Sequence, residues 1–214
     1  MKNLIYIFFI VISISSCDLE LQTVPEFTPE KVEIVTFKEQ TVWDWLQTKN
    51  TPAGTAANSG NFDSLNKAIV LAGMEVEFQS TNPDRTFLLL NNNAWIGTAV
   101  GKINRDLTGA TGRGMNQIPV AKLKALLQYH IIDAYVDQRE ALPSFAEIYM
   151  FQSLIPGETG RISAARNDRY SITINSSPLI PTSTKRSVNV FRHNYVFKYG
   201  IMHQLDAYAR YAPF

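Results

Sequence analysis

The stretch from Pro119 to Ile132, PVAKLKALLQYHII, decides the fold class of this chain. Proline is favoured in the first turn of a helix, where its missing N–H would have no partner in any case. Apolar side chains then recur at the spacing of one helix face: Val120, Leu123, Leu126 and Leu127. This periodicity predicts a helix that ends near His130 and buries one face.

Upstream of this helix the sequence predicts two more short helices and a strand. Residues 41–49 begin with a threonine that can cap a helix, and residues 63–71 precede Gly73, a residue type that commonly ends one. Residues 85–90 form an apolar run typical of a short buried strand. Residues 95–118 are rich in glycine, and we expect them to be irregular.

Downstream of Pro143 the pattern changes from helical to extended. Several segments are typical of strands: residues 161–165, 171–175, 187–191, 195–197 and 201–207. Helices in the first half of a chain and strands in the second indicate an α+β domain.

Four segments of the chain resemble the fasciclin domain, and they follow one another in that family's order. Residues 62–74, FDSLNKAIVLAGM, look like its second helix, and residues 84–95, DRTFLLLNNNAW, resemble its first signature. Residues 123–132, LKALLQYHII, are similar to the central tyrosine–histidine motif. Residues 199–206, YGIMHQLD, look like the closing signature. The resemblance extends over about residues 41–212.

This resemblance implies a β-sandwich or wedge with flanking helices. It also implies adhesion or interaction outside the cell rather than catalysis. In animal relatives the tyrosine–histidine region has been linked to receptor adhesion, which makes Tyr129 and His130 candidate binding residues here. His203 and Asp206 match the closing signature, and we expect them to be structural.

The sequence also departs from the family pattern. Leu90 stands where the family has proline, Asn93 where it has glutamate, and Tyr199 where it has asparagine. Three segments look longer than the family norm: residues 50–61, 96–118 and 176–187. Because binding usually resides in loops, these departures leave the ligand open.

The first 17 residues have the layout of a bacterial export signal with a lipidation site. Lys2 is followed by an apolar run of about 11 residues, whereas a membrane-spanning helix needs about 20. The run ends in Ile14-Ser15-Ser16-Cys17, which resembles the lipobox of bacterial lipoproteins. We therefore expect residues 1–16 to be removed and Cys17 to carry the lipid, palmitate included. A permanent N-terminal anchor helix is the alternative.

Residues 17–36 read as an acidic, proline-containing tether, and residues 37–214 as the folded domain. Asp18 and Glu20 loosely fit a surface-export signal of some Gram-negative bacteria, although a merely soluble linker explains them equally well. The expected location is the outer membrane of a Gram-negative bacterium, with the domain exposed at the surface.

Charge and cysteine content exclude several classes of function. The chain has 20 Lys+Arg and 19 Asp+Glu, and removal of Lys2 leaves 19 of each. A net charge of zero argues against a nucleic-acid partner, since such binders are usually basic. Cys17 is the only cysteine, so a lipidated protein would have no disulfide and would depend on its core.

Each candidate site residue has a structural interpretation beside the functional one. His130 is either half of an adhesive pair with Tyr129 or a buried, hydrogen-bonded histidine. His203 and Asp206 would form an acid–base pair only if they faced each other, but residues three apart in a strand point to opposite faces. Three scattered histidines provide no local zinc spacing, so no metal and no cofactor are expected.

Exposed aromatic side chains would suit a carbohydrate platform. Trp43 is the tryptophan we expect to be accessible, whereas Trp45 and Trp95 fall at predicted core positions. Arg161, Arg166 and Arg169 lie among acidic residues and indicate a solvated hairpin rather than an anion site.

The sequence thus favours a non-enzymatic adhesion or interaction module of the cell envelope, with an extracellular protein or polysaccharide as partner. The alternative is an accessory glycan-binding subunit of an outer-membrane polysaccharide uptake system. An enzyme is less favoured, because no nucleophile, metal cluster or acid pair is visible. The sequence does not indicate an oligomeric state.

Overall fold

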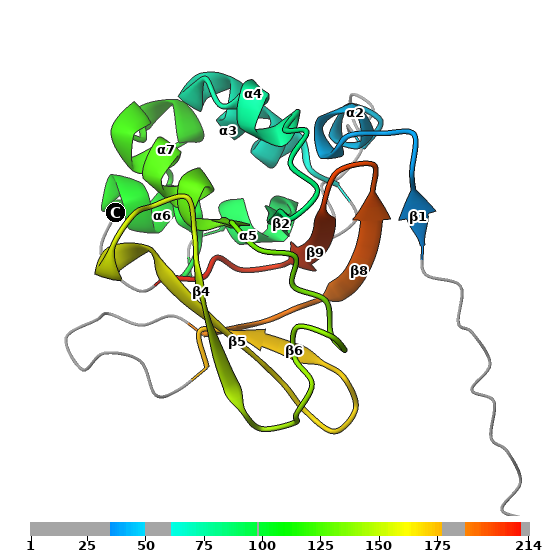
Figure 1. Cartoon of the computed structure of the whole chain (residues 1–214). Helices are drawn as coiled ribbons and strands as arrows, with labels where there is room; N and C mark the ends of the chain where they lie inside the picture. Colours follow the sequence, from blue (N-terminus) through cyan, green and yellow to red (C-terminus); the bar gives the residue numbers. More distant parts are fainter. Residues whose placement is uncertain (1–34, 50–60, 98, 177–186, 211–214) are drawn as a thin grey trace, which may run out of the picture. The chain divides into compact units, whose positions relative to one another are not determined.

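The computed structural model describes residues 35–49, 61–97, 99–176 and 187–210 (Figure 1). The helices are α2 (Val42–Gln47), α3 (Asp63–Ala72), α4 (Glu75–Phe78), α5 (Asn92–Trp95), α6 (Ile103–Thr108) and α7 (Val120–Tyr129). The first strands are β1 (Thr36–Phe37), β2 (Thr86–Leu90), β3 (Ile131–Ile132) and β4 (Ile148–Gln152). The later strands are β5 (Arg161–Arg166), β6 (Ile172–Ile174), β7 (Val188–Asn189), β8 (Arg192–Phe197) and β9 (Ile201–Leu205). Single turns of 3-10 helix cover Met115–Gln117 and Glu158–Gly160.

The strands form two sheets, which confirms the α+β prediction. One sheet has the order β1-β8-β9-β2-β3, and the other has the order β4-β5-β6-β7. β2 and β9 pair in parallel from Thr86↔Ile201 to Leu90↔Leu205, although 110 residues separate the ends of the two strands in sequence. Every residue of both strands is buried, which explains why β2 is an uninterrupted apolar run after its threonine.

The helices gather on one side of the β2–β9 pair, and the four-stranded sheet lies on the other side (Figure 1). α3 and α7 contact each other, and the leucine face of α7 enters the core through Leu123, Leu126 and Leu127. Trp95 is the last residue of α5 and is fully buried, and its indole Nε1 donates to the Leu90 carbonyl at 3.2 Å. The core therefore joins the helical layer to the five-stranded sheet.

The predicted helix boundaries are largely confirmed. α2 begins with a capping box in which Asp44 N donates to Thr41 Oγ1 at 3.1 Å and Thr41 N donates to Asp44 Oδ2 at 3.0 Å. α3 ends at Gly73, which adopts a left-handed conformation with φ of 62°. α7 ends at Tyr129, and His130 is its C-cap.

Two sequence-based expectations about this half of the chain are wrong. Val120 was expected in the buried stripe of α7, but its side chain is 56% exposed because it lies in the first turn, before the helix reaches the core. Residues 95–118 are not irregular throughout: α6 lies within them and buries Ile103 and Leu107, which are four residues apart. The glycines on either side of this helix concealed that spacing.

The strand region also contains features that the sequence did not reveal. β4 was not predicted, although it pairs with β5 along its whole length. The sequence left residues 192–194 between two predicted strands, but His193 lies within β8, at a bulge between Arg192 and Tyr195 where Asn194 has a φ of 60°. An alternating pattern is hard to recognise where a bulge shifts the register.

The N-terminal end of the described chain is already part of a sheet. β1 pairs in parallel with β8, and Val196 N donates to the Val35 carbonyl at 3.0 Å. Val35 and Thr36, assigned to the tether from the sequence, therefore bind to the domain. The predicted signal, Cys17, most of the tether and residues 50–60 and 177–186 lie outside the described residues. Nowhere in the described part is a helix both long and apolar enough to span a bilayer.

Candidate functional site

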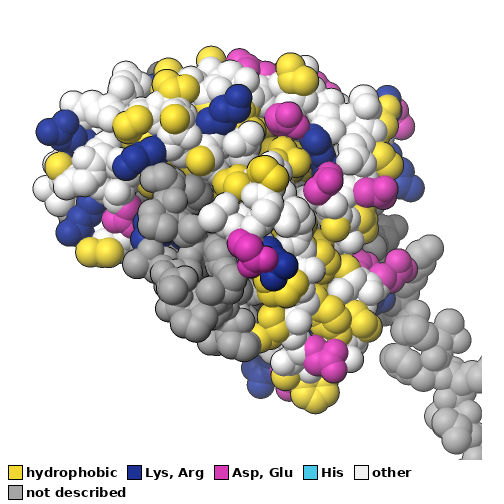
Figure 2. Space-filling model, turned by 60° about the vertical axis from the view of Figure 1, so that its left-hand side comes forward, with side chains coloured by type: hydrophobic (Ala, Val, Ile, Leu, Met, Phe, Trp, Pro, Cys, Tyr) yellow, Lys and Arg dark blue, Asp and Glu magenta, His cyan; other side chains and the backbone are white. Residues whose placement is uncertain are grey.

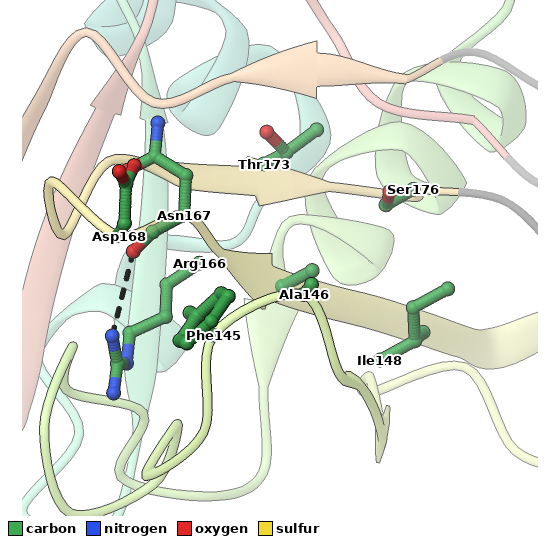
Figure 3. Close-up of a pocket in the computed structure, with 9 residues that line it drawn as sticks. Phe145, Ala146, Ile148, Arg166, Asn167, Asp168, Thr173 and Ser176 are labelled. Atoms are coloured by element: carbon green, nitrogen blue, oxygen red, sulfur yellow. Dashed lines mark hydrogen bonds between the residues drawn. The ribbon is translucent and has the colours of Figure 1, made fainter.

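A pocket of about 600 Å³ lies on the face of the four-stranded sheet that points away from the core (Figure 3). The side chains of Ile162, Ala164, Ile172 and Ile174 are buried in the core. Because side chains alternate along a strand, Ala165 and Thr173 point to the opposite face. The pocket is lined by residues from the segment before β4, from β4, and from the β5–β6 hairpin: Phe145, Ala146, Ile148, Ala165, Arg166, Asn167, Asp168, Thr173 and Ser176.

The floor of the pocket is a row of cross-strand partners. Ile148 of β4 pairs with Ala165 of β5, and Ala165 pairs with Thr173 of β6. Hydrophobic side chains also gather over the lower part of the face in Figure 2, at the height where Figure 1 places the four-stranded sheet. The floor is therefore mainly apolar, with one hydroxyl at its β6 side.

The loop that carries Phe145 is fixed by hydrogen bonds on both sides of that residue. Ser144 N donates to Tyr149 Oη at 3.1 Å, and Ala146 N donates to the Arg166 carbonyl at 2.9 Å. Arg166 donates in turn to the carbonyls of Leu142 and Pro143 through its guanidinium group. Despite this support, the Phe145 side chain itself is 64% exposed.

The β5–β6 hairpin that carries Asp168 is fixed in a similar way. Asn167 Oδ1 accepts from the N–H groups of Arg169 and Ser171, both at 2.9 Å, in the manner of an Asx turn. The Tyr170 ring lies 4.5 Å from the Arg166 guanidinium carbon, which is a cation–π distance. Among the described residues, no side chain or backbone group bonds to the Asp168 carboxylate.

The pocket has no excess of charge. Arg166 and Asp168 are its two charged residues, and they have opposite signs. Three of the five N–H donors of Arg166 point to the carbonyls of Leu142, Pro143 and Asn167, as the dashed line in Figure 3 shows for Asn167. The chemical groups open to a ligand are therefore mainly an aromatic face, an apolar floor, a carboxylate and hydroxyls.

The predicted pair of Tyr129 and His130 lies inside the core rather than on the surface. Tyr129 Oη donates to the Arg161 carbonyl at 2.9 Å and accepts from Asn175 Nδ2 at 3.0 Å. Tyr129 thus connects α7 to the four-stranded sheet. A direct contact between this pair and a macromolecule would require the core to open, and their binding role stays a prediction.

His130 and His203 each connect two backbone segments through both ring nitrogens. His130 Nδ1 donates to the Leu126 carbonyl at 2.8 Å, and its Nε2 accepts from Ala209 N at 3.0 Å. His203 Nε2 donates to the Val136 carbonyl at 2.7 Å, and its Nδ1 accepts from Asn194 N at 3.2 Å. Burial lowers the pKa of each imidazole from 6.5 to about 4, so both are neutral at pH 7.

The remaining predicted residues are also separate from the pocket. Asp206 is the first residue after β9 and is exposed, whereas His203 is buried within that strand. Trp43 is half-buried against the edge of the core, and Trp45 and Trp95 are core residues. In the described ranges, no cluster of three or more His, Cys, Asp or Glu side chains could hold a metal ion.

The sequence did not reveal the pocket because its residues meet only through strand register. Phe145 follows a proline and a serine in a stretch that reads as a loop, and Asp168 reads as one charge in a solvated hairpin. The one available signal was an aromatic residue between two small neighbours, Ser144 and Ala146. That signal becomes informative only when β4 is known to lie beside β5.

Two comparisons relate the chain to known proteins. The sequence model of the fasciclin domain matches residues 60–208, which is more than half of the 214 residues. Among solved structures, the chain is similar to a FAS1 domain pair from the insect cell adhesion molecule Fasciclin I, with a TM-score of 0.52 and 14% identity. That match covers 79% of this chain and 50% of the other, so the chain spans about half of the domain pair. No curated protein matches the sequence.

Proposed function

This chain belongs to the fasciclin domain family, and from this membership together with its N-terminal sequence we infer that it is a lipid-anchored, non-enzymatic interaction module of a bacterial cell envelope. The fold is compatible with adhesion, because its structural relative comes from a cell adhesion molecule. The observation that carries the proposal is the combination of this family fold with an N-terminal sequence that resembles a lipobox and ends at Cys17.

The state of the buried histidines supports a non-enzymatic role. A general base needs an accessible ring nitrogen with a pKa near the working pH. His130 and His203 use both nitrogens to hold backbone segments, and burial lowers their pKa values to about 4. Neither histidine is therefore available as a base in the folded protein.

The lipid at Cys17 would place the domain at the outer membrane of a Gram-negative bacterium. A diacylglyceryl group carries two acyl chains, and stable anchoring takes two such signals. The acidic residues that follow, Asp18 and Glu20, loosely fit a surface-export signal, and we propose that the domain is displayed on the cell surface. There the domain would meet an extracellular protein or polysaccharide.

The pocket favours one more specific version of this role. An accessory glycan-binding subunit of an outer-membrane polysaccharide uptake system needs a site for sugars but no catalytic group. The exposed Phe145 ring, the apolar floor and the Asp168 carboxylate provide such a site. This version remains the second candidate beside general adhesion.

Cells that make the full chain can test the proposal against cells that make the Cys17→Ser variant. We expect the natural chain in the outer-membrane fraction, degraded when intact cells are treated with proteinase K. Its cells should also attach to surfaces coated with extracellular protein or polysaccharide, and the variant cells should not. A natural chain found free in the periplasm, or equal attachment by both kinds of cell, would contradict the proposal.

A further inference from the structure

The pocket on the four-stranded sheet combines features that suit one class of ligand. We propose that it binds a neutral pyranose unit of a polysaccharide, with Phe145 as the stacking surface and Asp168 as the main hydrogen-bond acceptor. This inference rests on the proposed interaction function and names the ligand and the site. Its volume of about 600 Å³ lies within the range of roughly 300–1,000 Å³ that is typical of small-ligand sites.

Phe145 provides a stacking surface that is already in place. An exposed phenylalanine on a loose loop would need no explanation, because single apolar residues are common on protein surfaces. Here the loop is held by hydrogen bonds from Ser144 N, from Ala146 N and from the Arg166 guanidinium group. A loop that is fixed in this way loses little backbone entropy when the C–H face of a sugar packs against its ring.

The polar groups of the pocket are short of hydrogen-bond donors. The Asp168 carboxylate has two acceptor oxygens and, in the described part of the chain, no partner. Thr173 Oγ1 donates its proton to Asn189 Oδ1 at 2.9 Å, so toward the pocket it can only accept. Neighbouring hydroxyls of a sugar supply these missing donors, and a carboxylate can accept from two of them at once.

The balance of charge favours a neutral ligand over a charged one. An acidic sugar would meet the Asp168 carboxylate, and Arg166 offsets this only in part, because three of its five N–H donors already bind backbone carbonyls and its guanidinium group lies over the Tyr170 ring. A cationic group would meet the Arg166 guanidinium group at the same wall. An uncharged polyol encounters neither repulsion.

The test is a glycan microarray probed with the full lipidated protein in a detergent that contains no sugar. The array carries neutral gluco-, manno-, galacto- and xylo-oligosaccharides beside uronic-acid and sulfated ones. We expect selective binding to neutral glycans. Phe145→Ala and Asp168→Asn should each weaken it by roughly tenfold, the effect of one lost stacking contact or charge-assisted hydrogen bond.

Matched controls separate the pocket from the rest of the surface. Phe191→Ala removes another exposed phenylalanine, 47% exposed, and Asp84→Asn neutralises another exposed aspartate; both should bind like the natural protein. Unchanged melting temperatures would show that all four variants are folded. A variant that lost stability would be replaced by Phe145→Leu, which keeps an apolar side chain but removes the ring.

Three results would overturn the inference: no neutral glycan is bound, only acidic glycans are bound, or the pocket variants bind as well as the controls. These results leave the proposed function intact if cells still attach to a protein-coated surface through the anchored chain. If the natural chain purified from cells carries no lipid but still binds neutral glycans, the result contradicts the anchoring and supports the proposed pocket.

Discussion

His130 Nε2 accepts a hydrogen bond from Ala209 N at 3.0 Å, across 79 residues of sequence. The same ring donates through Nδ1 to Leu126, so one imidazole ties the end of α7 to the C-terminal segment. His203 has the corresponding arrangement between Val136 and Asn194. The two histidines of the family-like motifs thus act as internal cross-links.

Replacing His130 with alanine should lower the free energy of unfolding by at least about 1–3 kcal/mol, because the Ala209 N–H would be buried without a partner. Denaturant unfolding measures this loss. His193→Ala is the control, since that ring is only half-buried, and it should cost less. Equal losses for the two variants would mean that the cross-link contributes nothing.

Stability should fall with pH below neutrality because of the same two rings. Burial lowers their pKa values to about 4 in the folded protein, whereas the ordinary value of 6.5 applies in the unfolded chain. As the pH falls, the unfolded chain therefore binds protons first. The contribution of the neutral rings is complete above pH 6.5 and is lost as the pH falls toward 4. Each ring accounts for about 3 kcal/mol over this range.

Urea titrations at pH 7, 5.5 and 4.5 check this pH dependence. Carboxyl groups also titrate near the lower end, so the informative quantity is the difference between the natural protein and His203→Asn. We expect the variant to lose less stability between pH 7 and pH 5.5. Parallel pH profiles for the two proteins would contradict the assignment of neutral, desolvated histidines.

Leu126→Ala should destabilise the protein by about 2–5 kcal/mol, because the side chain is fully buried against the core. Val120→Ala, at the exposed start of the same helix, should change the free energy of unfolding by less than about 0.5 kcal/mol. Comparable losses at both positions would show that the helix is rotated from the orientation described.

Gly200→Ala should disrupt the turn between β8 and β9. Gly200 has a φ of 91°, and a Cβ atom there would lie 2.4 Å from the Arg85 carbonyl oxygen of the neighbouring strand region. Gly109→Ala is the control: its φ of 71° imposes similar backbone strain, but no atom lies within 4 Å of the added carbon. We expect Gly200→Ala to cost about 1–3 kcal/mol more than the control in thermal unfolding.

The sequence predicted those parts of the fold in which the pattern of apolar residues within one segment is enough to identify a helix or a strand. The leucine stripe of α7 and the apolar run of β2 are of this kind, and both are present as expected. α6 was missed because only Ile103 and Leu107 mark its buried face within a glycine-rich segment. A single pair of apolar residues does not establish a period.

The candidate site depends on information that a single sequence does not contain. Phe145 and Asp168 line one pocket because Ile148 pairs with Ala165 and Ala165 pairs with Thr173. A shift of one residue in either pairing would turn Ile148 or Thr173 of the pocket floor to the other face. Tyr129 and His130, by contrast, were recognisable as a motif, but their burial followed only from the packing of α7.

The most direct test of the central claim, that this domain is anchored in the envelope by lipid, is mass spectrometry of the N-terminal peptide of the mature protein. We predict that the peptide begins at Cys17, that residues 1–16 are absent, and that the cysteine carries the mass of a diacylglyceryl group. A mature chain that begins elsewhere, or that carries an unmodified Cys17, would contradict the account.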